Sequence, residues 1–152
     1  MSKKAFTLVE MAIVLVIIGI LSAMVFSNIG GFGKKARDQK RASDLQKAYA
    51  ILTAYFNANG TLPSPGNNKK FREVTELRDI KPPLSGEDYY YNNTTTAVNK
   101  GYLAACFESG IGGNTIANNL ANYLGGTASC TTVIGSVSCP GGSECQAYEI
   151  SF

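Results

Sequence analysis

The chain has 152 residues, with 14 Lys and Arg against 11 Asp and Glu, so its formal net charge is +3. This length suffices for one domain with a modest core and not for two, and so small a charge does not by itself imply a nucleic-acid partner. The sequence has no histidine, which excludes nucleophile–His–acid sites and removes the commonest general base and metal ligand.

An apolar segment spans residues 6–26, and Glu10 is its only charged residue. As an α-helix this segment would be about 30 Å long, which matches the hydrocarbon core of a bilayer. We predict a hydrophobic transmembrane and assembly helix over residues 6–28, preceded by a short basic leader, residues 1–5. A signal peptide cut after Ala23 is the alternative, but an acidic residue near the start of the apolar core does not fit it.

Glu10 needs a partner, because a carboxylate within an apolar span costs roughly 3 kcal/mol on insertion scales. Cleavage between Ala5 and Phe6 would create an α-amino group on Phe6, four residues before Glu10. This amine and the carboxylate could pair within one chain or between neighbours, and in a low dielectric the attraction would offset much of the cost of burial. In the intermolecular case a lone subunit would carry a poorly satisfied charge, which joining a neighbour would satisfy.

The N-terminal motif is a basic leader, a small residue, Phe-Thr-Leu-x-Glu and an apolar helix, and it reads Lys3-Lys4-Ala5-Phe6-Thr7-Leu8-Val9-Glu10. It resembles the N-terminus of type IV pilins and type II secretion pseudopilins. The resemblance implies cleavage by a prepilin peptidase between Ala5 and Phe6 and methylation of the Phe6 amine. It also implies that Glu10 pairs with the Phe6 amine of an adjacent subunit, and that Thr7 belongs to the assembly motif. Gly19 matches a family glycine implicated in local unwinding within filaments.

The sequence departs from the family pattern at two positions. Ala5 stands where the family has Gly before the cut, and because alanine is also small we expect processing to continue at a lower rate. Ser27 stands where a helix-bending Pro is frequent, and Gly30, Gly31 and Gly33 follow. Because each glycine lowers helix stability by about 1 kcal/mol relative to alanine, we expect the helix to melt or bend near these glycines.

The charges around the apolar segment predict the opposite orientation from the motif. Six basic residues lie between positions 34 and 47, against two in the leader, and basic residues usually stay in the cytoplasm. The cysteines and the N-terminal motif predict an exported head, and we follow the motif because it is more specific. We interpret the basic run as a solvated helix face rather than as a DNA-contacting strip.

Residues 29–59 are predicted to form the amphipathic half of the helix. Their apolar residues recur every three or four positions, which is helical spacing: Ala42, Leu45, Tyr49, Leu52 and Phe56. We expect this stripe to pack against a sheet as plain core, and the charged face to look toward solvent or neighbouring subunits. Asn59, Gly60 and the following prolines are expected to end the helix.

Residues 60–152 are predicted to form a globular, β-rich head. The expected elements are a short helix over 71–78, strands at 89–91 and 101–107, a short helix with Ile116, Leu120 and Leu124 closed by Gly125, a strand within 131–138, and a half-buried last strand at 148–152. The predicted fold class is α+β, a long N-terminal helix on a small antiparallel sheet. Glu87 and Asp88 could help to bind calcium, but no spaced set of acidic ligands supports such a site.

The four cysteines all lie late in the chain: Cys106, Cys130, Cys139 and Cys145. An even number in a small, loop-rich region predicts disulfides and an oxidising compartment. A zinc site is the rival interpretation, but such sites usually contain a close C-x2-C pair, which the sequence lacks. Three pairings are possible, and we prefer Cys106 with Cys130 and Cys139 with Cys145 because each closes a local loop.

We therefore predict a structural subunit of a type IV pilus-like filament, with no enzyme activity, cofactor or metal. The resemblance implies residence in a bacterial inner membrane before assembly and a filament in the periplasm or at the cell surface afterwards. The implied partners are a prepilin peptidase, an inner-membrane assembly platform with its ATPase, and further copies of the chain. The alternatives are a type II secretion pseudopilin, a minor or competence pilin, and a solitary membrane-anchored binding protein. Adhesion, motility, secretion and DNA uptake all use similar subunits.

Overall fold

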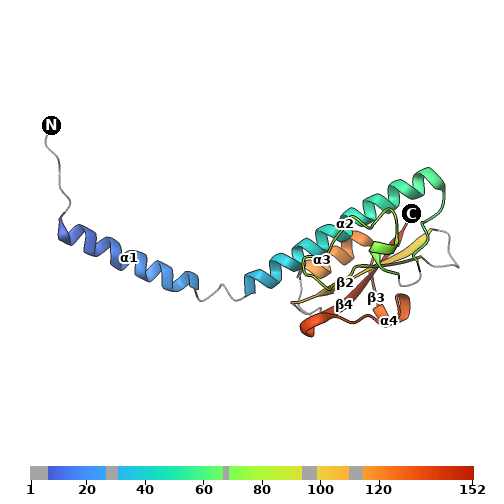
Figure 1. Ribbon diagram of the computed structural model, residues 1–152. Coiled ribbons are helices and arrows are strands. Elements are labelled where there is room, and N and C mark those ends of the chain that lie inside the picture. The colour runs from blue at the N-terminus through green and yellow to red at the C-terminus, as the bar shows by residue number, and fades with distance from the viewer. Residues whose placement is uncertain (1–6, 27–30, 67–68, 94–98, 110–114) are drawn as a thin grey trace. The chain divides into compact units, whose positions relative to one another are not determined.

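In the computed structural model the chain forms two compact units, residues 1–33 and 34–152, and each is described by itself. The structure describes residues 7–26, 31–66, 69–93, 99–109 and 115–152. The first unit contains helix α1 (Leu8–Phe26), and the second contains the head together with nearly all of α2 (Phe32–Asn59) (Figure 1).

Helix α1 is apolar on all sides. None of its residues is buried, and its large apolar side chains are between 48% and 86% exposed. Its mean hydropathy is 2.7, and its 19 residues span about 28 Å, close to the thickness of a bilayer core. The predicted apolar helix is therefore confirmed, and by length and composition it can cross a membrane. A helix of this kind needs lipid or other helices around it.

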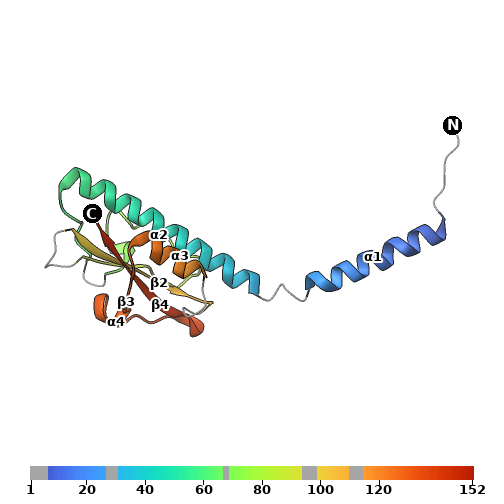
Figure 2. The same ribbon diagram turned by 180° about the vertical axis from the view of Figure 1, so that it is seen from behind.

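Helix α2 lies along one face of a small sheet, as the two opposite views of the head show (Figures 1 and 2). Of the predicted apolar stripe, three residues are buried and two are half-buried: Ala42, Leu45 and Leu52, then Tyr49 and Phe56. The helix ends at Asn59, as predicted. Gly60 follows with a φ of +70°, a left-handed conformation that glycine adopts without strain, and its N–H donates to the carbonyl of Phe56 at 2.7 Å.

The sheet has four strands in the order β1-β2-β4-β3, and every neighbouring pair is antiparallel. At its centre β2 (Lys100–Phe107) pairs along its whole length with β4 (Glu144–Ser151). The short strands β1 (Tyr90–Asn93) and β3 (Thr127–Ala128) form the two edges. The α+β class is confirmed, as is the central strand predicted at 101–107.

The two faces of the sheet carry separate cores, because successive strand residues point to opposite sides. The larger core joins the α2 stripe to the inner face through residues such as Leu103, Phe107 and Tyr148, and includes Leu120 of α3 (Thr115–Leu124). The smaller core lies on the outer face, where Ala104 and Ala147 meet Cys130 and Ile134. Residues 129–143, which we call the covering segment, lie over this outer face. The sheet is therefore enclosed between α2 and the covering segment (Figure 1).

Two predicted elements of the head are wrong. Instead of a strand within 131–138, the structure has the short helix α4 (Cys130–Val133) followed by irregular chain and the turn η3 (Pro140–Gly142). Val133, Ile134 and Val137 pack onto the outer sheet face from a covering segment, so their apolar character reflects burial and not strand pairing. The helix predicted at 71–78 is only the single turn η2 (Phe71–Glu73), followed by turns.

Helix α3 is confirmed, including its end. Ala117, Leu120 and Leu124 of this helix are buried in the larger core. Gly125 follows the last turn with a φ of +115° and donates its N–H to the carbonyl of Ala121 at 3.0 Å. This is the left-handed helix end that glycine favours.

Candidate functional site

The first turn of α1 contains a reciprocal hydrogen-bonded cap between Thr7 and Glu10. The backbone N–H and the hydroxyl of Thr7 each donate to Oε2 of Glu10 at 2.8 Å. In return, the N–H of Glu10 donates to the Thr7 hydroxyl oxygen at 3.3 Å. Thr7 directly precedes the helix and Glu10 is its third residue, which is the arrangement of a capping box. The Thr-x-x-Glu spacing was visible in the sequence and would have predicted it.

The cap changes the expectation for a lone subunit. If the carboxylate pairs only with the amine of a neighbour, the sequence predicts that Glu10 of a lone subunit is poorly satisfied. In the structure, Thr7 of the same chain donates two hydrogen bonds to that carboxylate. A charged group held by two such bonds at a helix N-terminus is partly compensated there. The predicted cleavage residues, Ala5 and Phe6, lie outside the described residues.

Gly19 and the glycines at positions 30, 31 and 33 were singled out in the sequence, and the structure describes the surroundings of some of them. Gly19 lies within α1, and the helix runs through it without interruption. No atom lies within 4 Å of the position that a Cβ would take there, so this chain shows no packing reason for the glycine. Of the glycines expected to melt or bend the helix, Gly33 lies inside α2, and Gly30 lies outside the described residues.

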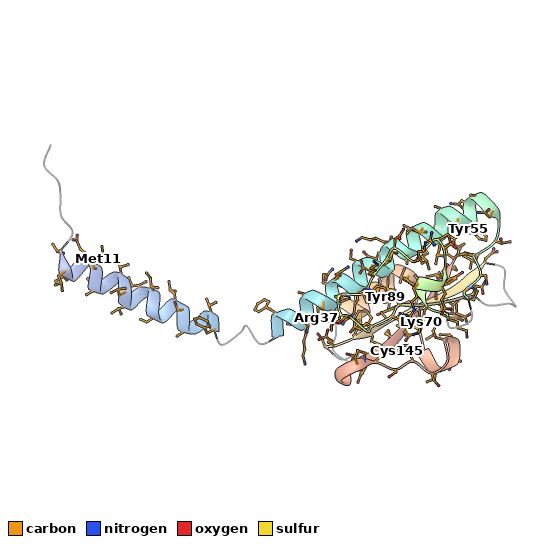
Figure 3. All side chains as sticks on the ribbon, in the orientation of Figure 1. Met11, Arg37, Tyr55, Lys70, Tyr89 and Cys145 are labelled. Atoms are coloured by element: carbon orange, nitrogen blue, oxygen red, sulfur yellow. A yellow bond between two sulfur atoms is a disulfide. The ribbon has the colours of Figure 1, made fainter. Side chains whose placement is uncertain are left out.

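A buried group of charged side chains joins α2 to the head. Arg41 is 1% exposed, and its guanidinium donates to three carboxylates: to Asp38 Oδ1 at 2.7 Å, to Glu87 Oε1 at 2.6 Å and to Glu108 Oε1 at 2.8 Å. Arg37 adds a two-pronged contact, with Nε and Nη2 at 2.7 and 2.6 Å from the two oxygens of Glu108. We call these five residues the Arg41 cluster. Figure 3 shows Arg37 on α2, beside the head.

Asp38 connects this cluster to the end of β2. Its side chain is fully buried, and its two oxygens accept the N–H groups of Glu108 and Ser109 at 3.0 Å each. These are the residues at which the strand gives way to a turn. The carboxylate therefore satisfies backbone donors that no strand neighbour reaches, and it fixes where α2 lies against the sheet.

These contacts shift the pKa values of the side chains that make them. The hydrogen bond from Arg37, together with that from Arg41, outweighs burial and lowers the pKa of Glu108 to about 2. Burial alone would lower the pKa of Arg41, but its bonds to Glu108 and Glu87 raise it overall. Nearby, the Tyr89 hydroxyl donates to Asp44 Oδ2 at 2.9 Å, and burial with the adjacent Asp44 raises the pKa of Tyr89 far above its ordinary value.

The Arg41 cluster was not predicted from the sequence. The prediction that the charged residues of α2 face solvent or neighbouring subunits is wrong for Asp38, Arg41 and Asp44, all of them buried. The signal was the helical period, because Asp38 precedes Ala42 and Arg41 precedes Leu45 by four positions each, which places the charged pair on the same face as the apolar stripe.

The acidic pair considered for calcium has other partners. Glu87 binds Arg41, as above, and Asp88 Oδ2 accepts from Lys70 Nζ at 2.7 Å. Within the described ranges, no group of three His, Cys, Asp or Glu residues is placed to hold a metal ion. These carboxylates therefore serve as ion-pair partners in the fold.

Two disulfides join the covering segment, residues 129–143, to the outer face of the sheet. Cys106 of β2 bonds to Cys139, and Cys130 of α4 bonds to Cys145 of β4, so all four cysteines are paired. Figure 3 labels Cys145 on the side of the sheet away from α2. The preferred pairing of Cys106 with Cys130 and Cys139 with Cys145 is wrong. Cys106 and Cys145 lie opposite each other in the β2–β4 register, and each bonds to the segment that crosses over them.

The family follows from comparison with known proteins. A sequence profile described as the prokaryotic N-terminal methylation motif matches residues 1–26. Type II secretion system core protein G of Vibrio cholerae is 30% identical over 102 residues, which cover 59% of this chain and 70% of that protein. The chain belongs to the type IV pilin and type II secretion pseudopilin family.

Other relatives come from both branches of this pilin and pseudopilin family. Type II secretion system core protein G of Escherichia coli is 34% identical over 83 residues, 55% of each chain. Type IV major pilin protein PilA of Myxococcus xanthus is 28% identical over 102 residues, 55% of this chain and 46% of that one. The chain spans about half the length of the first curated relatives that it matches. No solved structure matches it.

Proposed function

We propose that this chain is a structural subunit of a type IV pilus-like filament, held in a bacterial inner membrane by α1 before assembly. The exposure of α1 carries the proposal. Large apolar side chains cover every side of this helix, and the second unit of the chain has a complete core of its own. Such a helix is stable first in lipid and then against the helices of other copies.

We also propose that the N-terminus is cleaved and methylated before the subunit docks. The match of residues 1–26 to the N-terminal methylation motif supports cleavage between Ala5 and Phe6 and methylation of Phe6. The Glu10 carboxylate then exchanges its hydrogen bonds with Thr7 for a charge pair with the Phe6 amine of a neighbour. In an apolar helix bundle a charge pair is stronger than a pair of hydrogen bonds from neutral donors. Docking is therefore favoured once a neighbour's amine is free.

The proposed partners are those of the family. A prepilin peptidase would release the Phe6 amine, and an inner-membrane platform with its ATPase would extract α1 from the bilayer. Further copies of the chain would surround α1 in a filament in the periplasm or at the cell surface. Members of this family are structural subunits rather than enzymes, and the ion pairs of the Arg41 cluster, which hold α2 against the sheet, fit such a role.

A type II secretion pseudopilin is the second candidate. It is favoured by the relatives named core protein G, which are found in several species. Both candidates share α1 and the processing motif, and they differ in the length and location of the filament. Fibres sheared from the cell surface that contain this chain would support a pilus. A chain that is processed but found only in the envelope would support the pseudopilin.

Mass spectrometry of the intact protein from its native membrane tests the proposal as a whole. We expect a polypeptide that starts at Phe6 with a methylated α-amino group. A chain that still begins at Met1 would overturn the filament assignment and favour a solitary membrane-anchored protein. A chain that begins after Ala23 would show instead that the apolar segment is a signal peptide.

A further inference from the structure

The two disulfides are interlaced along the chain. The cysteines occur in the order 106, 130, 139 and 145, and the bonds join the first to the third and the second to the fourth. No bond therefore joins cysteines that are consecutive in the sequence. Both bonds depend on a feature that exists only after folding, which is the passage of residues 129–143 across the outer face of β2 and β4.

An unfolded chain favours a different pairing. The probability that two cysteines meet falls roughly as the −3/2 power of their separation. Cys139 and Cys145 are 6 positions apart, whereas the native bonds span 33 positions from Cys106 to Cys139 and 15 from Cys130 to Cys145. By this rule the local pair closes about four times as often as the shorter native bond and about thirteen times as often as the longer one.

Export that begins at the N-terminal end of the chain further favours the consecutive pairing over the native interlaced one. Cys106 and Cys130 leave the membrane before Cys139 and Cys145, so an oxidant that acts during export meets them first as a consecutive pair. The native sheet cannot form at that point, because β4 (Glu144–Ser151) is the partner of β2 along its whole length and lies at the C-terminus. Early oxidation therefore leads to the bonds 106–130 and 139–145.

We infer that this chain is a substrate for disulfide isomerisation, and that its native bonds arise by thiol–disulfide exchange after first oxidation in the consecutive pairing. The partner is a thiol reagent of the isomerase class, which presents a reactive thiolate to protein disulfides. The inference rests on the proposed export of the head and not on filament assembly.

The exchange balances without any further oxidant. The isomerase thiolate attacks Sγ of Cys145, breaks the 139–145 bond and releases the thiolate of Cys139. This thiolate attacks Sγ of Cys106, which forms the native 106–139 bond and releases Cys130. The Cys130 thiolate then attacks Cys145 in the mixed disulfide, forms the native 130–145 bond and regenerates the isomerase thiolate. Two disulfides enter and two leave, so electrons are conserved.

Oxidative refolding of the full chain tests the inference. The reduced, unfolded protein is diluted into detergent micelles with a thiol-free oxidant, either alone or with reduced and oxidised glutathione and a disulfide isomerase. We expect the consecutive pairing to exceed the interlaced one by about fourfold or more with oxidant alone. With the thiol system, we expect the interlaced pairing to become the major product.

The sequence determines which proteases can identify the disulfide pairing. Trypsin is of no use, because no Lys or Arg follows Lys100. After acid quenching and alkylation, cleavage at Glu108 and Glu144 separates Cys106 from Cys130 and Cys139 from Cys145. Thermolysin, which cuts before branched apolar residues, separates Cys130 from Cys139 at Val133 and Ile134. Disulfide-linked peptides identified by mass spectrometry then give the pairing directly.

Two double variants serve as matched controls. Cys106→Ser with Cys139→Ser leaves only the 130–145 pair, and Cys130→Ser with Cys145→Ser leaves only the 106–139 pair. Each has a single possible intramolecular bond, so its yield should be the same with and without the thiol system. If the wild-type chain reaches the interlaced pairing with oxidant alone, to within twofold of the yield with the thiol system, the sheet forms before oxidation and the inference is wrong. That outcome would leave the filament proposal untouched.

Discussion

Asp38 and Arg41 lie one helical turn apart in α2 and form an ion pair of 2.7 Å, with side chains 0% and 1% exposed. Through Glu87 and Glu108, the same guanidinium reaches the loop before β1 and the end of β2. The position of α2 over the sheet is thus set by polar contacts at the N-terminal end of the helix and by the apolar stripe further along. Removing one charge would leave the others buried without compensation.

Arg41→Met should destabilise the head strongly. Methionine replaces the volume of the arginine stem, but Asp38 and Glu87 lose their cation while remaining buried. Breaking a buried ion pair in this way typically costs about 3–5 kcal/mol. Urea unfolding of the full chain in detergent micelles, followed by the near-ultraviolet dichroism of the head's tyrosines, measures the loss.

Lys47→Met is the matched control for this substitution. Lys47 also pairs with an acidic residue of α2, Asp44, but at 3.5 Å and with its own side chain 64% exposed. An exposed pair of this kind contributes about 0–1 kcal/mol, so the variant should unfold close to the wild type. Equal unfolding midpoints for the two variants would show that the Arg41 cluster does not stabilise the head.

The stability of the head should fall at low pH partly through Glu108. The pKa of this carboxyl is lowered from its ordinary 4.5 to about 2 in the folded chain, so the folded state holds its proton less tightly than the unfolded state. The resulting stabilisation is complete above about pH 4.5 and is lost as the pH falls toward 2. Glu108→Gln removes this contribution, and the difference in unfolding free energy between wild type and variant should shrink over that pH range. A difference that is constant from pH 5 to pH 2.5 would contradict the assignment.

Local patterns predicted the elements whose partners lie close in sequence or follow a regular period. The stripe from Ala42 to Phe56 located α2, and Gly60 and Gly125 marked two helix ends. In each case, burial of one face or a single backbone conformation determines the structure, and both can be recognised in a short window. The alternation of Tyr148, Ile150 and Phe152 located only the second half of the last strand, because β4 begins at Glu144 and is buried on both faces.

The missed features all depend on contacts between distant segments. Arg41 is buried because Glu87 and Glu108, which are 46 and 67 positions away, neutralise it, and no local pattern shows that. Ile134 belongs to a segment that covers the sheet rather than joining it, and an apolar run does not distinguish these two kinds of burial. The Thr7–Glu10 cap is different, because its Thr-x-x-Glu spacing is local and is recognisable from the sequence alone.

Removal of either disulfide should destabilise the head to a degree set by the loop that it closes. In the chain-entropy model, a bond across 33 residues contributes about 4 kcal/mol and one across 15 residues about 3 kcal/mol. Cys106→Ser with Cys139→Ser should therefore cost slightly more than Cys130→Ser with Cys145→Ser. Urea unfolding of the two double variants, under conditions in which the remaining bond is intact, tests the order.

The exported protein should also contain no reactive thiol. All four cysteines are bonded, so alkylation of the unfolded, unreduced chain should add no mass. Addition of four alkyl groups without prior reduction would show that the cysteines remain thiols in the native compartment.

Assembly should depend on the charge of Glu10 more than on the Thr7–Glu10 cap. Glu10→Gln keeps an oxygen that can accept from Thr7, since glutamine also occupies the third helical position of a capping box, but it removes the charge that would pair with a neighbour's amine. A hydrogen bond to a charged group contributes about 1.5–3 kcal/mol, so filament incorporation should fall roughly tenfold or more. Thr7→Ala has the reverse effect on the contacts, because it removes the hydroxyl donor and leaves the charge.

Comparison of the variants separates the two roles of the carboxylate. Glu10→Ala and Glu10→Gln should both be cleaved to begin at Phe6 and should both assemble poorly, whereas Thr7→Ala should assemble better than either because a competing contact is removed while the charge remains. Incorporation is measured as the processed chain found in sheared or purified filaments, divided by the processed chain left in the membrane. If Glu10→Gln assembles like the wild type while Thr7→Ala fails, the carboxylate acts through the helix cap, and the pairing with the Phe6 amine is not what drives docking.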